Sequence, residues 1–448
     1  RFEVRQPLYI TKAEFFVDSE PGDGNGIPMV PADGQFHSTV EDMLGFVNTS
    51  GLCMGNHTVS VRALDSYSRW LVPGSTNARI LSASPGPIAI YVDDDNSFGT
   101  ECGTPAQPFD TIQEGLEVAR NGDTIQVLGG IYGEPVVIGQ DNVSLLGEGA
   151  LLTFIDPVIS GSCIEIDGRH NVDVEGFTLQ NCTADIGAGI HINDSFDITI
   201  AANALFANEA NFFGGGIAIT GNSSSVSIKN NVMSNNSSLN AASGIYLNTT
   251  GNNIRLVNNT LVDNSSATGG IHVQKGVPEI RNSILWGNNP LDLFGVSNSM
   301  ITYSLIGDCT YEGIGYNICG DPLFVLNDPY YHLVSCSPAV DAGDPADDYS
   351  QEPVPNGARI NMGAYGNTPE AEKPPNPTDT DGDTIVDACD NCTLVKNTNQ
   401  RDTNKDRYGN MCDPDLDNNG AVGISDFGLF KAAFGTSNAD ADFDGNGA

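Results

Sequence analysis

The tetrapeptides Gly189-Ile190-His191-Ile192 and Gly216-Ile217-Ala218-Ile219 belong to a repeat that decides the fold. In each of them, two apolar residues flank one outward position, an alternation typical of a short β-strand. The series starts at Cys163, Gly189, Gly216, Gly244 and Gly270, so its members recur at a nearly fixed interval. A regular interval of about 27 residues indicates a solenoid in which each repeat stacks on the one before it.

Two further series keep step with the first. One consists of the alternating segments 172–174, 198–200, 226–228 and 254–256. The other starts at Gly176, Asn203, Asn231, Asn259 and Asn282, and a little further along each repeat come Asn181, Asn208, Asn236, Asn264 and Gly287. Three short strands in each period of about 27 residues predict an all-β right-handed parallel β-helix, with successive strands about 4.8 Å apart.

The same alignment predicts the core of the coil. One inward column consists of Ile164, Ile190, Ile217, Ile245 and Ile271. Asn at the corners suits residues that need a positive φ, and stacked amides can hydrogen-bond along the coil axis. We therefore expect aliphatic stacks inside the coil and Asn stacks at its corners.

Residues 89–368 form the predicted coil with its two ends. An amphipathic helix with Phe109, Ile112, Leu116 and Ala119 on one face precedes the first strands, and Asp110 with Gln113 makes a capping-box pattern. Such a helix would cover the open end of the stack. The run from 91 to 132 resembles the start of bacterial pectate-lyase-like β-helix proteins. Segments 321–345 and 359–365 resemble the last turns of surface-anchored members.

Residues 1–85 carry a different pattern. Val59, Val61 and Ala63 would share one face of a strand, and a turn-rich segment at 21–26 separates this run from earlier ones. The region from 50 to 70 resembles the closing strands of bacterial immunoglobulin-like or fibronectin-like modules. We expect a small antiparallel β-sandwich, joined to the coil by a linker rich in Pro, Ser and Gly.

Charge excludes several classes of partner. The chain has 448 residues, with 19 Lys and Arg against 57 Asp and Glu, and a formal net charge of −38. Such a chain is repelled by nucleic acids and by anionic membrane surfaces, so neither is expected as a partner. No apolar run is long enough for a membrane span. Bound divalent cations are one way to neutralise so much negative charge.

The cysteines indicate an extracellular or cell-surface location, where sequons would permit glycosylation. The chain has ten Cys, and Cys309, Cys319, Cys389, Cys392 and Cys412 lie in polar loops without nearby His partners. Disulfides in an oxidising compartment explain them better than a zinc site does. Candidate glycosylation sites are Asn48, Asn56, Asn193, Asn222, Asn248 and Asn264. Chance sequons in Asn- and Ser-rich turns are the alternative.

The coil surface offers few groups for catalysis. The outward column Glu165, His191, Ala218, Tyr246 and His272 has one carboxylate, whereas a galacturonan hydrolase needs several on one face. His191 and His272 lie three rungs apart, about 14 Å, which is too far for direct partnership. A lyase needs a basic residue near a cation, and Arg255 is better explained by a surface pair with Glu279. We therefore predict no catalytic residues and consider Glu165, His191, Tyr246 and His272 a glycan-binding strip.

Residues 376–414 have regularly spaced acidic residues. The pattern closely resembles thrombospondin type 3 repeats, which implies that the segment folds around Ca²⁺. Alternate carboxylates suit a hard cation that takes six to eight oxygen ligands. The implied ligands are Asp379, Asp381, Asp383, Asp387, Asp390, Asp402, Asn404, Asp406 and Asp413. The resemblance also implies a Cys392–Cys412 disulfide but supplies no partner for Cys389.

Residues 415–448 match an EF-hand-like loop followed by a helix, and resemble the first half of a dockerin. The loop ligands would be Asp415, Asp417, Asn419, Ala421 and Asp426, with Gly at position 6. A second loop begins further along the tail with Asp442, Asp444 and Asn446 and lacks a closing acidic residue. The resemblance therefore implies an incomplete dockerin-like segment and a cohesin-like partner.

Together these patterns predict a secreted, non-enzymatic, calcium-binding structural or adhesive protein. Its partners would be further copies of itself in a fibre, a cell-surface protein or a polysaccharide. Residues 2–9 could add a strand to a neighbour's sheet, or serve as the first strand of their own sandwich. The alternative function is a polysaccharide lyase or glycoside hydrolase of the β-helix class that acts on acidic polysaccharides.

Overall fold

The computed structural model describes residues 8–49, 52–80, 88–96, 101–404 and 406–443. The chain divides into two compact units, Arg1–Ser227 with Asn236–Ile254 and Gln274–Gly276, and Ile228–Asn235 with Arg255–Val273 and Val277–Ala448. None of the helices in the described ranges is long and apolar enough to cross a bilayer.

The N-terminal region forms one antiparallel sheet in the described residues. Its strands, in spatial order, are β3 (Met43–Leu44), β2 (Ile27–Pro31), β1 (Ile10–Val17), β4 (Gly55–Asp65) and β5 (Gly74–Ile80). Val59, Val61 and Ala63 pair with alternate residues of β1, as the sequence pattern predicts. No second sheet is present among the described residues of this N-terminal region, so the structure does not show the expected two-layer sandwich. The alternation in the sequence indicates the strand pairing, but it does not reveal the number of layers.

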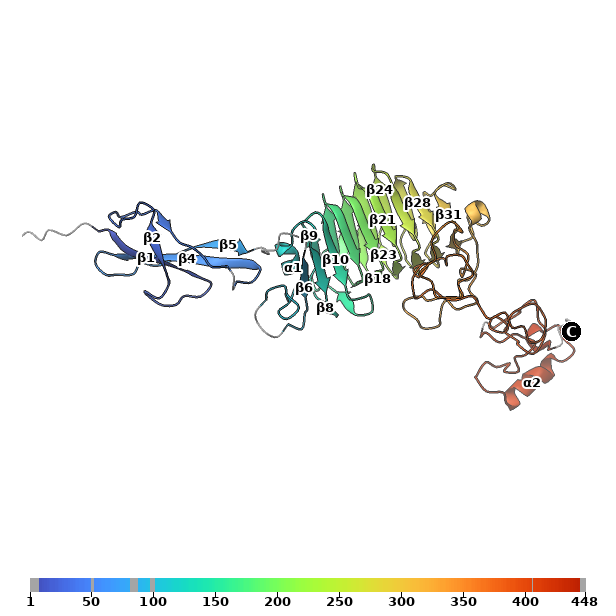
Figure 1. Ribbon diagram of the computed structural model, residues 1–448. Helices are drawn as coiled ribbons and strands as arrows, with labels where there is room; N and C mark the ends of the chain where they lie inside the picture. The colour runs from blue at the N-terminus through green and yellow to red at the C-terminus, as the bar shows by residue number, and fades with distance from the viewer. Residues whose placement is uncertain (1–7, 50–51, 81–87, 97–100, 405, 444–448) are drawn as a thin grey trace, which may run out of the picture. The chain divides into compact units, whose positions relative to one another are not determined.

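The coil consists of three parallel sheets, as predicted (Figure 1). The first contains β6 (Ala89–Val92), β7 (Thr124–Val127), β10 (Val143–Gly147), β13 (His170–Glu175), β17 (Phe196–Ala201), β21 (Ser224–Lys229), β25 (Ile254–Val257), β28 (Pro278–Arg281) and β31 (Ile301–Thr302). The second contains β8 (Gly130–Tyr132), β11 (Thr153–Ile155), β14 (Thr178–Gln180), β18 (Ala204–Phe206), β22 (Val232–Ser234), β26 (Thr260–Val262), β29 (Ile284–Trp286) and β32 (Leu305–Ile306).

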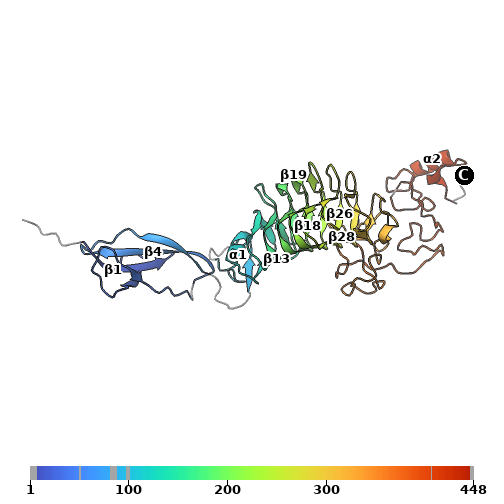
Figure 2. The same cartoon turned by 90° about the horizontal axis from the view of Figure 1, so that it is seen from above.

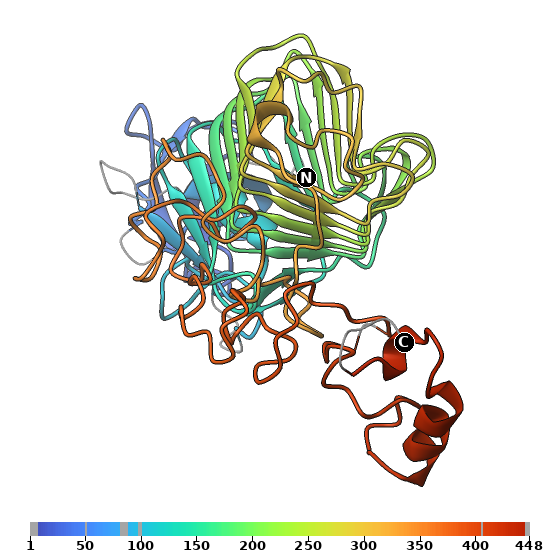
Figure 3. The same cartoon turned by 90° about the vertical axis from the view of Figure 1, so that its right-hand side faces the viewer.

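The third sheet holds the repeat that opened the sequence series. It contains β9 (Val136–Ile138), β12 (Ile164–Asp167), β16 (Ile190–Asn193), β20 (Ile217–Gly221), β24 (Ile245–Thr249), β27 (Ile271–Lys275) and β30 (Leu293–Phe294). A short fourth sheet, which the sequence did not predict, contains β15 (Thr183–Ile186), β19 (Glu209–Phe213) and β23 (Ser237–Ser238). Figure 2 shows β19 in the loops that project from the coil. Figure 3 shows the strands in flat walls and the projecting loops at one corner.

The predicted aliphatic column is confirmed. Ile164 pairs with Ile190, Ile190 with Ile217, and Ile217 with Ile245, and all four side chains are fully buried. Each buried Ile contributes on the order of 1.5–3 kcal/mol of transfer free energy. This column is therefore one of the apolar stacks that stabilise the coil.

The corner Asn residues form two buried ladders, in which Asn side chains of successive turns hydrogen-bond to one another. In one ladder, the backbone and side-chain N–H groups of Asn208 donate to Asn236 Oδ1 at 3.1 and 2.9 Å. In the other, Asn231 donates in the same way to Asn259 Oδ1 at 3.2 and 3.1 Å. Amide stacking is confirmed, and it satisfies donors that burial would otherwise leave unpaired.

The positive φ lies at the residue before most of these Asn, so that part of the prediction is wrong. Ala202, Ala207, Asn230, Asn235, Asn258 and Asp263 all have a positive φ, from 51° at Ala202 to 54° at Asn235. Of the aligned residues, Gly176, Asn181, Asn282 and Gly287 do have a positive φ. The left-handed residue turns the chain at the corner, and the residue after it then points inward to join the ladder.

The described helices lie outside the strands of the three coil sheets. Helix α1 (Ile112–Val118) buries Ile112 and Leu116 against the coil, and Phe109 and Ala119 are also buried, as predicted. Its N-cap is Thr111, whose hydroxyl accepts from Glu114 N, so the predicted Asp110 capping box is wrong by one position. The described C-terminal helices are η1 (Ile314–Tyr316), α2 (Ile424–Ala433) and η2 (Ala439–Ala441).

All the cysteines are paired in disulfides. The Cys309–Cys319 and Cys392–Cys412 pairs are present as predicted. Cys389, for which the resemblance supplied no partner, pairs with Cys336. The other two pairs are Cys53–Cys102 and Cys163–Cys182. Disulfides throughout the chain are consistent with an extracellular protein.

Candidate metal sites in the tail and the coil surface

The predicted outward column of the third sheet has the expected register. Glu165 pairs with His191, His191 with Ala218, and Ala218 with Tyr246. Glu165 and His191 are half-buried, and His191 Nε2 lies 3.1 Å from Thr220 Oγ1. Burial lowers the pKa of His191.

Neighbouring side chains cover part of this column, so two of the four residues of the predicted glycan-binding strip, Tyr246 and His272, are not accessible to a glycan. Tyr246 is 5% exposed and its ring stacks on Phe213, with centroids 4.7 Å apart. His272, 6% exposed, lies against Phe294. The covering loops could have been anticipated from the apolar residues Ile186 and Phe213, which pack against Ala218 and Tyr246.

Two other surface predictions have clear outcomes. Arg255 Nε lies 3.0 Å from Glu279 Oε2, which confirms the surface pair. Asn264 is fully buried and its Nδ2 donates to Met233 O and Asn288 Oδ1, so it cannot carry a glycan in the folded chain. Among the other sequons, Asn48, Asn222 and Asn248 are exposed and Asn193 is half-buried. The side chain of Asn56 lies outside the described residues.

The tail contains three windows of equal length with the same spacing of oxygen donors. They start at Asp379, Asp402 and Asp415 and end at Asp390, Asp413 and Asp426. In each window, the N–H of the sixth residue donates to the first carboxylate: Thr384 to Asp379 at 3.0 Å, Arg407 to Asp402 at 2.9 Å, and Gly420 to Asp415 at 2.7 Å. The three windows therefore share one backbone turn.

The sixth residue of each window has a left-handed backbone. Its φ is 85° at Thr384, 80° at Arg407 and 81° at Gly420. Only Gly takes this conformation without steric cost, and a β-branched residue such as Thr is strained there. The turn is thus imposed by the window as a whole and not by the preference of its sixth residue.

Carboxylates converge in the first and third windows. One ligand oxygen from each of Asp379, Asp381 and Asp383 lies within 4.8 Å of the others, and the same holds for Asp415, Asp417 and Asp426. Burial and the charges of its neighbours raise the pKa of Asp381, and burial with the charges of Asp426 and Asp415 raises the pKa of Asp417. Each cluster therefore repels its own members unless a cation or a proton joins it.

These groups fit a hard divalent cation. Oδ2 of Asp381 is buried and accepts no hydrogen bond among the described residues. A buried carboxylate oxygen beside two others is an acceptor in need of a positive ligand. In the third window, Asn419 and Ala421 occupy positions 5 and 7, where an EF-hand loop supplies further oxygens.

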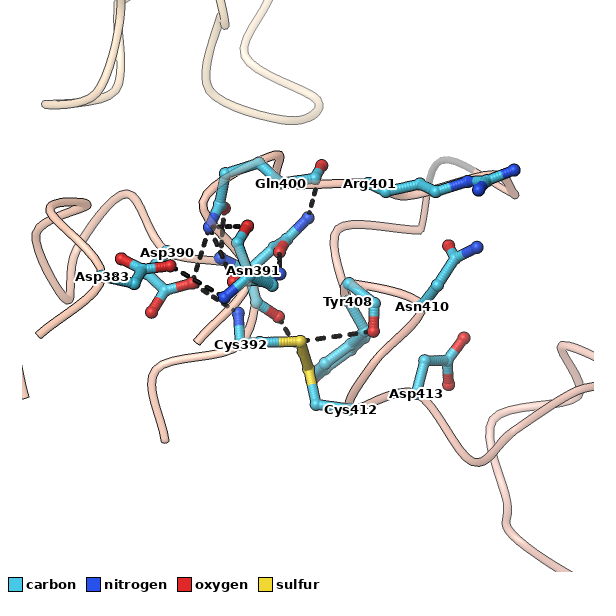
Figure 4. The surroundings of a disulfide bond; sticks show 12 residues. Asp383, Asp390, Asn391, Cys392, Gln400, Arg401, Tyr408, Asn410, Cys412 and Asp413 are labelled. Carbon is cyan, nitrogen blue, oxygen red and sulfur yellow. Dashed lines mark hydrogen bonds between the residues drawn. A yellow bond between two sulfur atoms is a disulfide. The ribbon is translucent and has the colours of Figure 1, made fainter. Parts of the chain in front are cut away.

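Other predicted ligands are placed differently. Asp387 accepts from the N–H and the hydroxyl of Thr380, outside the first cluster. Asp390 accepts from Cys392 N and Gln400 Nε2 beside the Cys392–Cys412 disulfide (Figure 4). In the second window, Asn404 Nδ2 donates to Asp413 Oδ2, and Asp406 accepts from Tyr408 N. Asp442 belongs to no described cluster, and Asp444 and Asn446 lie outside the described residues.

Comparisons with known proteins support the coil at the level of the fold. Residues 143–304 match the family model described as right handed beta helix region. A search of curated proteins found no match. Among solved structures, pectin methylesterase PemA from Erwinia chrysanthemi is 12% identical, with a TM-score of 0.29, covering 55% of this chain and 76% of that one.

Two further solved structures are similar at the same level. A pectin methylesterase in complex with a hexasaccharide is 10% identical with a TM-score of 0.28, covering 56% of this chain and 78% of that one. A family 28 exopolygalacturonase from Yersinia enterocolitica is 11% identical with a TM-score of 0.16, covering 72% of this chain and 93% of that one. TM-scores this low carry no argument about function.

Proposed function

We propose that this chain is a secreted, calcium-binding structural or adhesive protein. The coil serves as a scaffold, and the tail is a segment that Ca²⁺ orders. The protein would assemble with further copies of itself in a fibre, or attach to a cell-surface or cohesin-like partner. A formal net charge of −38 favours this assignment because bound cations would reduce repulsion between assembled copies.

The observation that supports the proposal most is the convergence of carboxylates in the tail. Two sets of three carboxylates each bring oxygens within 4.8 Å, and Asp381 of the first set has a buried oxygen, Oδ2, without a hydrogen bond. Few apolar side chains are buried in this part of the chain, so cation binding would add order to that supplied by the Cys336–Cys389 and Cys392–Cys412 disulfides. Calcium, with six to eight oxygen ligands at flexible geometry, suits these loops better than Mg²⁺.

A scaffold role for the coil is supported by where titratable groups gather. In the described ranges, clusters of three or more potential ligands lie within residues 33–41, 101–114, 379–383 and 415–426. None of these belongs to the strands of the three coil sheets. The alternative, a lyase or hydrolase acting on an acidic polysaccharide, shares only the β-helix fold with this chain and would depend on Glu165 and His191.

Calorimetric titration of the full chain with Ca²⁺ tests the proposal. We expect binding that is lost in part in Asp381→Asn and Asp417→Asn, whereas the control Asp387→Asn keeps the wild-type isotherm. Absence of calcium binding by the wild-type chain would reject the metal-binding role. Turnover of polygalacturonate that disappears in His191→Ala would favour the alternative. Electron microscopy with and without Ca²⁺ separates isolated particles from fibres.

A further inference from the structure

Two carboxylates in the segment that closes the coil, those of Asp341 and Glu352, each have one buried oxygen and take no part in the tail sites. Glu352 is only 4% exposed, and its Oε2 atom is buried without a hydrogen-bond partner in the described structure. Asp341 is partly buried, and its Oδ1 atom is also buried and without such a partner. Buried acceptors are nearly always satisfied in folded proteins, so two unpaired carboxylate oxygens require an explanation.

Both carboxylates belong to residues that bond to the same buried residue. Asn361, which is 1% exposed, donates its N–H to Glu352 Oε1 at 2.9 Å and accepts from Asp341 N at its Oδ1 at 2.7 Å. Asn367 N also donates to Glu352 Oε1 at 2.9 Å. One oxygen of Glu352 is therefore fixed by two backbone donors, while the other is left for a further ligand.

No basic side chain forms an ion pair with either carboxylate in the part of the chain that the structure describes. Arg359, the basic residue of the same segment, donates from Nε to Gly343 O and from Nη2 to Ala342 O, so its hydrogen bonds are made to carbonyl groups. The charge of Arg359 only partly offsets the effect of burial on the pKa of Asp341. The turn at Gly357, with φ of 56°, packs closely against the Asp341 carboxylate and encloses it.

We propose that Glu352 and Asp341 bind one divalent cation with a preference for oxygen ligands, of the Ca²⁺ type, in the segment that closes the coil. The unpaired oxygen of each carboxylate supplies a ligand and the two charges balance the ion. The cation would join residues 341 and 352 across the loop between them. This site is separate from the tail windows and does not depend on their binding calcium.

A shared proton is the competing explanation. Burial raises the pKa of both carboxyl groups, and the charge of Asp341 raises the pKa of Glu352 further. Without a cation, the pair would therefore take up a proton more readily than ordinary carboxylates. The two explanations differ in whether a metal ion is bound at neutral pH.

The number of Ca²⁺ ions bound per full-length chain, measured by equilibrium dialysis, separates them. Glu352→Gln should bind one ion fewer than wild type, and the control Glu370→Gln, whose carboxylate is 63% exposed, should bind the same number. An unchanged number in folded Glu352→Gln would overturn the proposal and favour the shared proton. Asp381→Asn and Asp417→Asn report on the tail sites alone, so failure there affects only the proposed function.

A second measurement guards against loss of folding in the variant. Crystals of the wild-type chain grown with Tb³⁺ should show an anomalous peak bonded to Glu352 Oε2 and Asp341 Oδ1. A map with peaks in the tail windows and none between these two carboxylates would contradict the proposal.

Discussion

The coil and the tail are both periodic in sequence but are held together in different ways. In the coil, the Ile that recurs once per turn is buried, and two ladders of Asn side chains accept from backbone and side-chain N–H groups of the Asn one turn earlier. In the tail, the repeat is a shorter window whose shared feature is its oxygen donors. Helix α2 leaves Ile424 and Phe427 at 90% and 66% exposure, and Phe434, the residue directly after it, is 77% exposed.

This difference separates two sources of order in one chain. The strands of the coil bury apolar side chains, and its corner Asn residues satisfy buried backbone donors. In the tail, carboxylates of like charge lie close together, and we propose that a bound cation offsets their repulsion. The predictions below test whether the two regions respond separately, beginning with the largest effect.

Removal of Ca²⁺ should have the largest effect. In chelator, we expect residues 379–426 to lose protection from proteases, because the carboxylate clusters then repel each other. The coil should keep its β circular dichroism signal. Mass spectrometry of the fragments after brief digestion measures this, and equal cleavage of the tail with and without chelator would contradict the account.

Breaking an amide ladder should destabilise the coil and leave calcium affinity unchanged. Asn236→Ala removes the acceptor of two Asn208 donors and a donor to Leu205 O. We expect a loss of about 2–4 kcal/mol in the free energy of unfolding, since each buried unsatisfied group costs about 1–3 kcal/mol. Urea unfolding measures it, with the exposed Asn222→Ala as control. A loss no larger than that of the control would show that the ladder is not stabilising.

Neutralising one carboxylate of the third window should weaken calcium binding without affecting the coil. In Asp417→Asn, we expect about a tenfold loss of affinity at that site, equivalent to about 1.4 kcal/mol, because one of three converging charges is removed. Calorimetry measures the affinity. Asp387→Asn, which changes a carboxylate outside the clusters, should leave it unchanged.

Removing the backbone strain at Thr384, the left-handed residue of the first window, should have the smallest effect, and it should raise calcium affinity instead of lowering it. Thr384→Gly removes strain at φ of 85° and should raise calcium affinity by a few-fold, equivalent to about 1 kcal/mol. Arg407→Gly should act in the same direction on the second window, and calorimetry measures both affinities. A loss of affinity in both variants would show that these side chains contribute favourably to the sites.

The sequence period predicted which residues stack on one another, but it did not predict the backbone conformation at each corner. The stacking of Ile190, Ile217 and Ile245 depends on alternation alone, and the structure confirms it. The corner geometry was wrong by one position, because an Asn can serve either as the left-handed turn or as the ladder residue after it. Spacing does not distinguish these roles.

The sequence did not predict which residues cover the outer face of the third sheet, and this was the larger omission. Phe213, which covers Tyr246, lies between the aligned strands, where no period operates, and Phe294, which covers His272, comes from the shorter strand β30. The same holds for the pair Glu352 and Asp341, whose burial depends on how a Pro-containing segment folds back. In the tail, the acidic spacing predicts Ca²⁺ ligands, but it does not reveal that Asp387 accepts from Thr380.

Hydrogen exchange of the full chain with and without Ca²⁺ tests the central distinction most directly. We predict that chelation speeds exchange at the amides of Thr384 and Gly420, which donate to the first carboxylates of their windows, and leaves the strands β16, β20 and β24 unchanged. Exchange at Thr384 and Gly420 that does not depend on Ca²⁺ would contradict the account, as would equal acceleration in the three strands.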